Sequence, residues 1–124
     1  MIRVGTDICS LKRIAAAYER FGDRFLNRIL TESEKTYVLS SRAHTTARIA
    51  GRFAAKEAAS KALGTGWYGI GWKEIEISRL PSGEPRLYLH GRAATRAQKM
   101  GLKSWELSIS HEREYAVATV IAFD

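Results

Sequence analysis

Hydrophobic and polar positions change their spacing several times in the first third of the chain, and each change marks a new element. Residues 2–8 are β-branched at every second position, which predicts a strand. Ser10 is placed to cap a helix with apolar residues at helical spacing, and Asp23 is placed to begin a second helix after Gly22. The segment 31–34, Thr-Glu-Ser-Glu, has the spacing of a capping box and predicts a third, short helix.

The rest of the chain contains one long helical segment and several short extended ones. A helix is expected from about His44 to Leu63, with Gly64 as its C-cap and a glycine-rich loop after it. Two β-hairpins and a basic helix follow, with strands at 73–79, 86–89, 105–111 and 114–123 and the helix at 91–101. The order predicts an α+β fold in which an antiparallel sheet packs with one long central helix and several shorter helices. We expect a single domain over residues 1–124.

Composition adds a basic balance to this pattern. The chain carries 20 Lys and Arg against 13 Asp and Glu, a formal charge of +7, which favours an anionic partner; a solvated basic surface is the alternative. No segment approaches the roughly 20 apolar residues of a membrane-spanning helix, so no membrane association is expected. An acid at position 7 comes too early for a signal peptide, and Cys9 is the single cysteine. Both observations favour a cytoplasmic location.

Two carboxylates are the strongest candidates for chemistry. Glu57 lies at the edge of the inward alanine face of the long helix, where a carboxylate is costly unless it is paired or coordinated. Asp7 ends the first strand after a glycine, and the two acids together offer the ligands that Mg²⁺ takes beside a phosphate. The alternatives are a Glu57–Lys61 surface ion pair and a helix cap formed by Asp7. The sequence alone leaves these alternatives open.

Basic residues and glycines suggest further contacts with an anion. Arg48, Arg52 and Lys56 form one row of the long helix, an unfavourable like-charge arrangement that predicts a phosphate-binding edge. The Gly-Thr-Gly loop at 64–66 can wrap a phosphate with backbone N–H groups, or simply cap the helix. The first two helices carry an outward basic set that is either a solvated face or a docking site for an acidic protein: Lys12, Arg13, Arg20, Arg24 and Arg28.

Several motifs follow one another in a specific order. The first two motifs are Val4-Gly-Thr-Asp-Ile8 and Arg28-Ile-Leu-Thr31. The third is the long helical segment Gly51-Arg-Phe-Ala-Ala-Lys-Glu-Ala-Ala-Ser-Lys61 with its Gly-Thr-Gly loop. The last two are Ser82-Gly-Glu-Pro85 and Ser108-Ile-Ser-His111. Over nearly the whole chain this pattern resembles the holo-acyl-carrier-protein synthase family of 4′-phosphopantetheinyl transferases. The resemblance implies the 4′-phosphopantetheinyl transferase-like fold. It also implies transfer of 4′-phosphopantetheine from coenzyme A to a serine of apo-acyl carrier protein, with release of adenosine 3′,5′-bisphosphate, in fatty acid biosynthesis.

The resemblance gives each candidate residue a role. Asp7 and Glu57 are implied to hold Mg²⁺ on the coenzyme A pyrophosphate and Lys61 to neutralise phosphate charge, so these three are the implied catalytic residues. The implied coenzyme A contacts are Arg52, Lys61, Gly64, Thr65, Gly66, Ser82, Gly83, Pro85, Ser110 and His111. The implied acyl carrier protein contacts are Arg13, Arg20, Arg24 and Arg28.

The family also implies a homotrimer with active sites at subunit interfaces, where Arg52, the 82–85 turn and His111 of one subunit reach the nucleotide of the next. Glu34 is assigned to the capping box first and to catalysis second. Trp67, after the Gly-Thr-Gly loop, departs from the family and is expected to stay clear of the metal site. The group that takes the acceptor serine's proton stays open between a metal-bound water and Glu57 acting through water.

Two other functions remain as alternatives at this stage. A basic nucleic-acid-binding module fits the charge but leaves the two carboxylates unexplained and lacks the aromatic motifs of RNA-binding sheets. A non-catalytic coenzyme A-binding protein fits the same motifs without the reaction. The sequence does not specify which carrier protein is served, whether acyl-coenzyme A is accepted, or whether Mn²⁺ replaces Mg²⁺.

Overall fold

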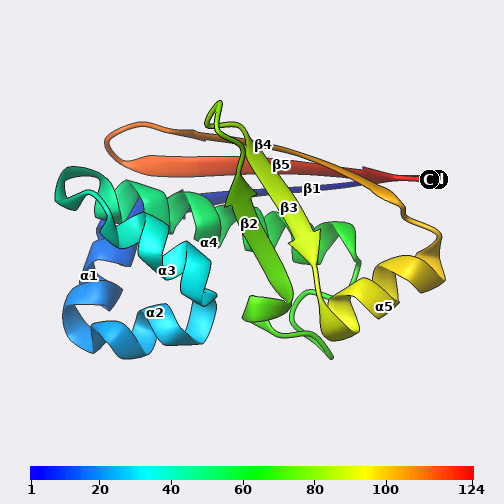
Figure 1. The fold of residues 1–124 in the computed structure, drawn as a ribbon, viewed down its shortest axis with the longest axis horizontal. Helices are drawn as coiled ribbons and strands as arrows, with labels where there is room; N and C mark the ends of the chain where they lie inside the picture. The colour runs from blue at the N-terminus through cyan, green and yellow to red at the C-terminus, as the bar shows by residue number, and fades with distance from the viewer.

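Helix α4, Thr45–Ala62, runs through the middle of the molecule and organises the elements around it (Figure 1). The computed structural model describes residues 1–124. Before α4 the chain forms β1 (Ile2–Ser10), α1 (Leu11–Phe21), α2 (Asp23–Ile29), α3 (Glu32–Leu39) and a 3₁₀ turn at Arg42–His44. After α4 it forms a 3₁₀ turn at Trp72–Glu74, β2 (Ile75–Arg79), β3 (Pro85–Leu89), α5 (Gly91–Met100), β4 (Ser104–His111) and β5 (Tyr115–Phe123).

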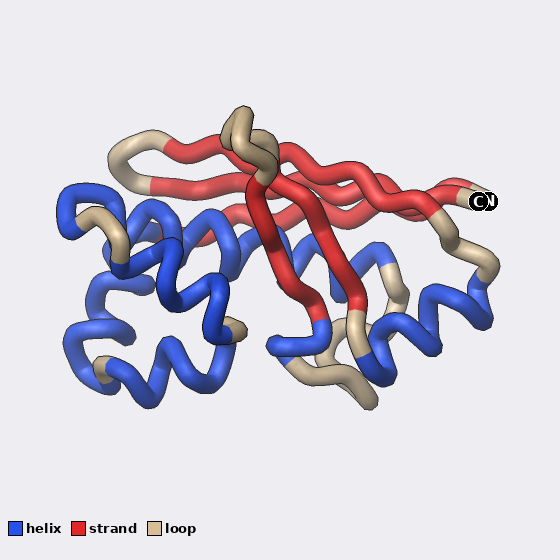
Figure 2. The backbone as a smooth tube through the Cα atoms, viewed as in Figure 1, coloured by secondary structure: helices blue, strands red, loops and turns tan.

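The five strands form two antiparallel sheets. The larger sheet has the order β1-β5-β4, with Ile2 and Ser104 both opposite Phe123, and the smaller one is the β2–β3 hairpin with Ile75 opposite Leu89. Figure 2 shows the three long strands running side by side along α4 and the hairpin crossing them, with α1–α3 gathered at one end of the molecule. The predicted α+β class is confirmed, and the structure adds that the strands divide into two sheets.

Local sequence signals account for most of the element boundaries. The Ser10 hydroxyl accepts a hydrogen bond from the Arg13 N–H at 3.2 Å and starts α1 as predicted. Gly22 separates α1 from α2 with a φ of 55°, a conformation that favours glycine. Thr31 and Glu34 form both bonds of the predicted capping box.

Small side chains bring α4 into close contact with β1. The alanines at positions 50, 54, 58 and 62 form one face of the helix and are fully buried. A Cβ placed on Gly5 would overlap the carbonyl oxygen of Ala58, so only glycine fits where strand and helix cross. This contact sets Asp7, two residues further along β1, beside the same stretch of α4 that carries Glu57.

The apolar alternation of β1 marks the face of the sheet that turns away from α4. The residues of β1 that face the helix are small or polar, because α4 lies too close for larger ones. The opposite face carries exposed aliphatic side chains from β1 and β5, with exposed fractions between 40% and 76%: Ile2, Val4, Ile8, Val117 and Ile121. An exposed apolar patch of this kind is typical of an interaction surface.

The chain ends lie together at one end of the large sheet (Figure 2). The Met1 amine is 3.4 Å from the Asp124 carboxylate. No helix is long and apolar enough to cross a bilayer.

Candidate functional site

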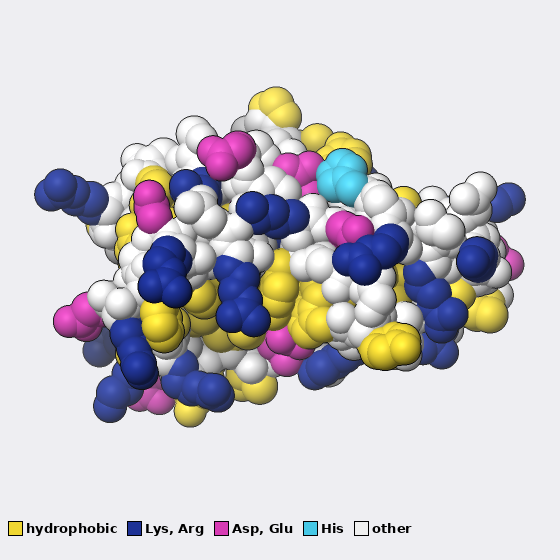
Figure 3. Space-filling view, turned by 90° about the horizontal axis from the view of Figure 1, so that it is seen from below, with side chains coloured by type: hydrophobic (Ala, Val, Ile, Leu, Met, Phe, Trp, Pro, Cys, Tyr) yellow, Lys and Arg dark blue, Asp and Glu magenta, His cyan; other side chains and the backbone are white.

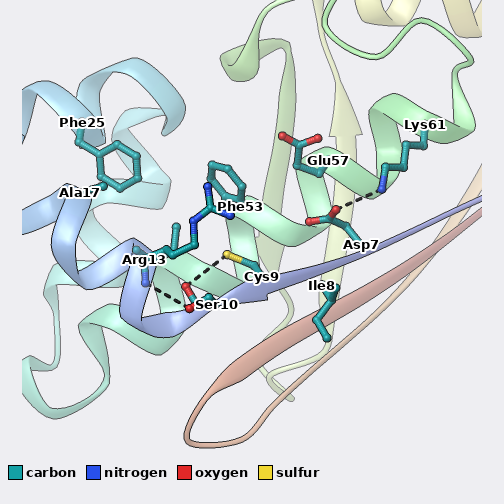
Figure 4. Close-up of a pocket in the computed structure, with 11 residues that line it drawn as sticks. Asp7, Ile8, Cys9, Ser10, Arg13, Ala17, Phe25, Phe53, Glu57 and Lys61 are labelled. Atoms are coloured by element: carbon teal, nitrogen blue, oxygen red, sulfur yellow. Dashed lines mark hydrogen bonds and ion pairs between the residues drawn. The ribbon is translucent and has the colours of Figure 1, made fainter.

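Asp7, Glu57 and Lys61 meet in one pocket, as the sequence predicted for a metal and phosphate site. The pocket has a volume of about 490 Å³ and lies between β1, α1, α2 and α4. In Figure 4 the two carboxylates and Lys61 lie together at one end, and Phe25 lies at the other. The other lining residues are Ile8, Cys9, Ser10, Arg13, Ile14, Ala17 and Phe53.

Hydrogen bonds at this end of the pocket settle the two alternatives that the sequence left open. The Lys61 ammonium donates to Asp7 Oδ1 at 3.1 Å and to the Thr6 carbonyl at 3.0 Å, so the Glu57–Lys61 ion pair is not formed. Ser10 caps α1, which leaves Asp7 free of that task. The Asp7 side chain is 17% exposed and Lys61 is 52% exposed, so the pair faces the open side of the pocket.

The donor set fits a magnesium ion that arrives with a phosphate. Asp7 and Glu57 provide carboxylate oxygens, and no cluster of three His, Cys, Asp or Glu residues exists to hold a metal alone. Mg²⁺ characteristically takes one or two carboxylates and fills its octahedron with phosphate and water oxygens. The negative field of the site reaches Cys9: burial raises the pKa of its thiol to about 11, and the nearby Asp7 and Glu57 add to that rise against the opposing effect of Arg13.

Trp67 contacts the site, contrary to the prediction that it stays clear. Its indole Nε1 donates a hydrogen bond to Glu57 Oε1 at 3.2 Å. Its ring stacks on Trp72 with centroids 3.9 Å apart, and Trp72 lies 4.9 Å from Phe53. The prediction failed because the loop after α4 folds back along the helix, which the glycine pattern alone does not reveal.

Lys56 does not belong to a phosphate-binding edge, which corrects the interpretation of the basic row on α4. Its side chain is fully buried, and its ammonium donates to Glu34 Oε1 at 2.7 Å and to the carbonyls of Ile29 and Trp72 at 2.6 and 3.0 Å. The counter-anion that the row required is Glu34, a residue of α3. Glu34 is 1% exposed and lies outside the pocket, so its role is structural, with the capping box as predicted.

The other two arginines of the row surround a tyrosine. The guanidinium groups of Arg48, Arg52 and Arg79 lie 4.1 to 4.5 Å from the centre of the Tyr37 ring. Arg52 is 6% exposed and its Nε has no hydrogen-bond partner. Burial lowers the pKa of Arg52, with Tyr37 and Glu34 opposing. Three cations and an unpaired buried donor make this cluster a candidate anion site.

The predicted nucleotide contacts are separate from the metal pocket within one chain. Arg52 and His111 line a small pocket of about 240 Å³ beside Tyr37, and Ser110 and His111 line another of about 400 Å³. The turn with Ser82, Gly83 and Pro85 forms the tip of the β2–β3 hairpin, and none of these three residues lines the metal pocket.

The Gly-Thr-Gly loop resembles a helix cap more than a phosphate loop. The N–H groups of Gly64 and Gly66 donate to the carbonyls of Lys61 and Ser60, and the Thr65 hydroxyl donates to Gly66. Two arginines that the sequence analysis missed close this end of α4. Arg3 donates to the Ala62 carbonyl at 2.9 Å and Arg96 to the Leu63 carbonyl at 3.1 Å, where cations stabilise a helix C-terminus.

The arginines assigned to a protein partner form an exposed face next to the pocket. Arg24 and Arg28 border a hollow of about 500 Å³ with Phe21, and this hollow shares Ala17 and Phe25 with the metal pocket. Figure 3 shows Lys and Arg side chains spread over the underside of the molecule, with acidic side chains interspersed among them. Arg13 and Arg20 are exposed on α1, and Arg13 also lines the metal pocket.

Comparisons with known proteins agree with this site. Residues 3–120 match the family described as the 4′-phosphopantetheinyl transferase superfamily. The holo-[acyl-carrier-protein] synthase of Gloeobacter violaceus is 53% identical over 118 residues, which are 95% of this chain and 89% of that protein. The crystal structure of holo-[acyl-carrier-protein] synthase from Neisseria meningitidis aligns with a TM-score of 0.91 and 36% identity over 100% of both chains. The Helicobacter pylori synthase in complex with coenzyme A aligns with a TM-score of 0.85 and 34% identity over 97% of this chain and 99% of that one. The chain therefore belongs to the 4′-phosphopantetheinyl transferase superfamily.

Proposed function

We propose that this protein transfers the 4′-phosphopantetheine group of coenzyme A to a serine of apo-acyl carrier protein, in a Mg²⁺-dependent reaction that supplies holo-carrier for fatty acid biosynthesis. The observation that carries the proposal is the pocket in which Asp7, Glu57 and Lys61 meet beside an exposed arginine face. The relatives named holo-[acyl-carrier-protein] synthase support it over 95% or more of the chain. The nucleic-acid-binding and non-catalytic alternatives receive no support from them.

The reaction requires positioning and charge neutralisation more than a protein nucleophile. The carrier serine oxygen forms a bond to the phosphorus that bears the pantetheine arm, the bond from that phosphorus to the adenosine bisphosphate oxygen breaks, and the serine proton is released. Mg²⁺ bound by Asp7 and Glu57 supplies neutralisation of the pyrophosphate charge. Lys61 holds Asp7 at 3.1 Å and adds a positive charge at the open side of the pocket.

The arginine face gives the carrier protein its docking site in this proposal. Arg24 and Arg28 offer positive charge around an apolar hollow, which suits an acidic helix with apolar side chains at its centre. The hollow shares two residues with the metal pocket, so a helix seated there brings a serine near its end toward Glu57. Arg13 lines the metal pocket and lies on α1, the helix that also contributes Ala17 to the hollow.

We further propose that the active protein is a homotrimer with sites between subunits. The exposed aliphatic face of the large sheet supports self-association, because such a face is costly to leave in water. The separation of the Arg52 and His111 pocket from the metal pocket supports a shared site, because each chain then offers part of the coenzyme A contacts to its neighbour. Light scattering measures the mass directly, and a monomer at assay concentration would contradict this proposal.

The decisive experiment is a mass measurement on the carrier protein. Apo-acyl carrier protein incubated with coenzyme A, Mg²⁺ and this protein is expected to gain the mass of one phosphopantetheine group, and EDTA is expected to abolish the gain. Asp7→Ala and Glu57→Ala are expected to lower the rate at least about 100-fold, while Glu32→Ala, an exposed acid on α3 outside the metal pocket and the arginine hollow, serves as the control. A Glu57→Ala variant with the wild-type rate would refute the metal assignment. An unchanged carrier mass with retained coenzyme A binding would favour the non-catalytic alternative.

A further inference from the structure

Trp67 lies outside α4 and β1, and its side chain forms a hydrogen bond with a proposed metal ligand, Glu57. The other proposed ligand, Asp7, accepts its hydrogen bond from Lys61 of α4. The Trp67 indole N–H donates to Glu57 Oε1 at 3.2 Å, and a carboxylate oxygen is the only acceptor that this indole contacts. Glu57 itself is only partly buried on the exposed edge of α4. A glutamate side chain there has three rotatable bonds and no other hydrogen bond to restrict them.

The aromatic residues around Trp67 fix the position of its indole. The Trp67 ring lies on Trp72 at 3.9 Å with an interplanar angle of 23°, and Trp72 packs on Phe53 at 4.9 Å. The backbone of Trp72 is held in turn, because its carbonyl accepts a hydrogen bond from the buried ammonium of Lys56. The donor that reaches Glu57 is therefore anchored to the core through a continuous series of contacts.

We propose that Trp67 is a positioning residue that orients the Glu57 carboxylate for metal binding before the metal arrives. By occupying Oε1, the indole restrains the rotation of the carboxylate and leaves Oε2 free to face the phosphate and the cation. Hydrogen bonds to ligating carboxylates are a general means of tuning metal affinity. This role rests on the proposed function, since it requires that Glu57 is a metal ligand.

A purely structural role for Trp67 makes a different prediction. If the residue only packs on Trp72, replacing it by phenylalanine keeps the stacked ring and leaves metal binding unchanged. If it positions Glu57, Trp67→Phe keeps the packing and loses the N–H donor, so Mg²⁺ affinity falls. The expected loss is about 10-fold, at the low end of what removal of such a partner costs.

The experiment measures Mg²⁺ binding by calorimetry to the protein saturated with coenzyme A. Trp67→Phe is compared with the wild type and with Trp105→Phe, which removes an indole from β4 outside the site. Melting temperatures within a few degrees of each other show that all three proteins fold. In the transfer assay, kcat of Trp67→Phe is expected to recover as the Mg²⁺ concentration rises, while KM for the carrier stays unchanged. Equal Mg²⁺ affinity in Trp67→Phe and wild type would overturn the proposal.

A second measurement reads the contact itself in the intact site. The indole N–H resonance of Trp67, assigned with the two phenylalanine variants, is expected to move upfield in Glu57→Gln, because a neutral amide is a weaker acceptor than a carboxylate. The Trp105 resonance is expected to stay in place. A Trp67 resonance that ignores Glu57→Gln would refute the hydrogen bond. Failure of the wild type to bind Mg²⁺ at all would instead remove the metal assignment of the proposed function, and with it the role of Trp67.

Discussion

Replacing Glu34 by glutamine tests how far the fold depends on its buried ion pair. Glu34 Oε1 accepts from Lys56 at 2.7 Å and from the Thr31 N–H at 2.8 Å, and Oε2 accepts from the Ile77 N–H at 2.7 Å. Both side chains of the ion pair are fully buried. Glutamine has one acceptor oxygen, so its NH₂ group must face a donor, and Lys56 loses its counter-charge.

The expected cost of this change is large. Removing one partner of a buried ion pair typically costs about 3–5 kcal/mol, because the remaining charge is left without compensation. A loss of about 4 kcal/mol raises the unfolding constant roughly a thousandfold. With a urea dependence of about 2 kcal/mol per molar, the unfolding midpoint falls by about 2 M. Glu32→Gln, an exposed acid two residues earlier in α3, is the matched control and is expected to change the midpoint little.

The pH dependence of the free energy of unfolding provides an independent test of the same variant. Burial lowers the pKa of Lys56 from its ordinary value of 10.5, and Glu34 opposes that shift. Between this lowered pKa and 10.5 the unfolded chain binds more protons than the folded one, so the free energy of unfolding rises with pH in this window. Without Glu34 the pKa of Lys56 falls further, and the rise begins at a lower pH. The double variant Glu34→Gln/Lys56→Met is expected to lose less than the sum of the single losses. The expected loss in the free energy of unfolding of Glu34→Gln is about 3–5 kcal/mol. A loss below about 1 kcal/mol in urea unfolding, together with the pH dependence of the wild type, would refute this reasoning.

Three further predictions concern other parts of the molecule. A hydrogen bond from Thr31, with others from two neighbours, lowers the pKa of Glu76 from 4.5 against the effect of burial. The wild type therefore loses stability as the pH falls below 4.5. In Glu76→Gln, the fall of the free energy of unfolding with acid is expected to lack this contribution. Gly5→Ala is expected to cost about 3 kcal/mol in urea unfolding, because its Cβ overlaps the backbone of α4; a neutral effect would show that the contact is loose. In Asp7→Asn the pKa of the Cys9 thiol is expected to fall from about 11, which alkylation rates against pH measure; an unchanged profile would contradict the field attributed to Asp7.

Local signals in the sequence predicted most of the fold. Helix caps form at Ser10 and Thr31, and Gly22 separates two helices. These signals involve only residues close in sequence, so their spacing is enough to place α1, α2 and α3. The division of the strands into two sheets depends on pairings between strands that are far apart in sequence, such as β1 with β5. The close approach of α4 to β1 likewise depends on a contact between distant residues, Gly5 and Ala58.

The residues of the candidate site were predictable from residue type and motif order. The hydrogen-bond and ion-pair partners of these residues were less predictable. Asp7, Glu57 and Lys61 were named together, and they share one pocket. The partner of Lys56 was missed, because a like-charge row on one helix does not reveal an acid on another helix. Trp67 was missed for the same reason, since its approach to Glu57 depends on the path of a loop.

The contact at Gly5 also links the packing of the core to the proposed metal site. Strand and helix meet there backbone to backbone, so the main chains that carry Asp7 and Glu57 are held together before either side chain selects a rotamer. A larger residue at position 5 would push β1 away from α4 and carry Asp7 with it. The smallest residue of β1 therefore acts on the proposed site without touching it.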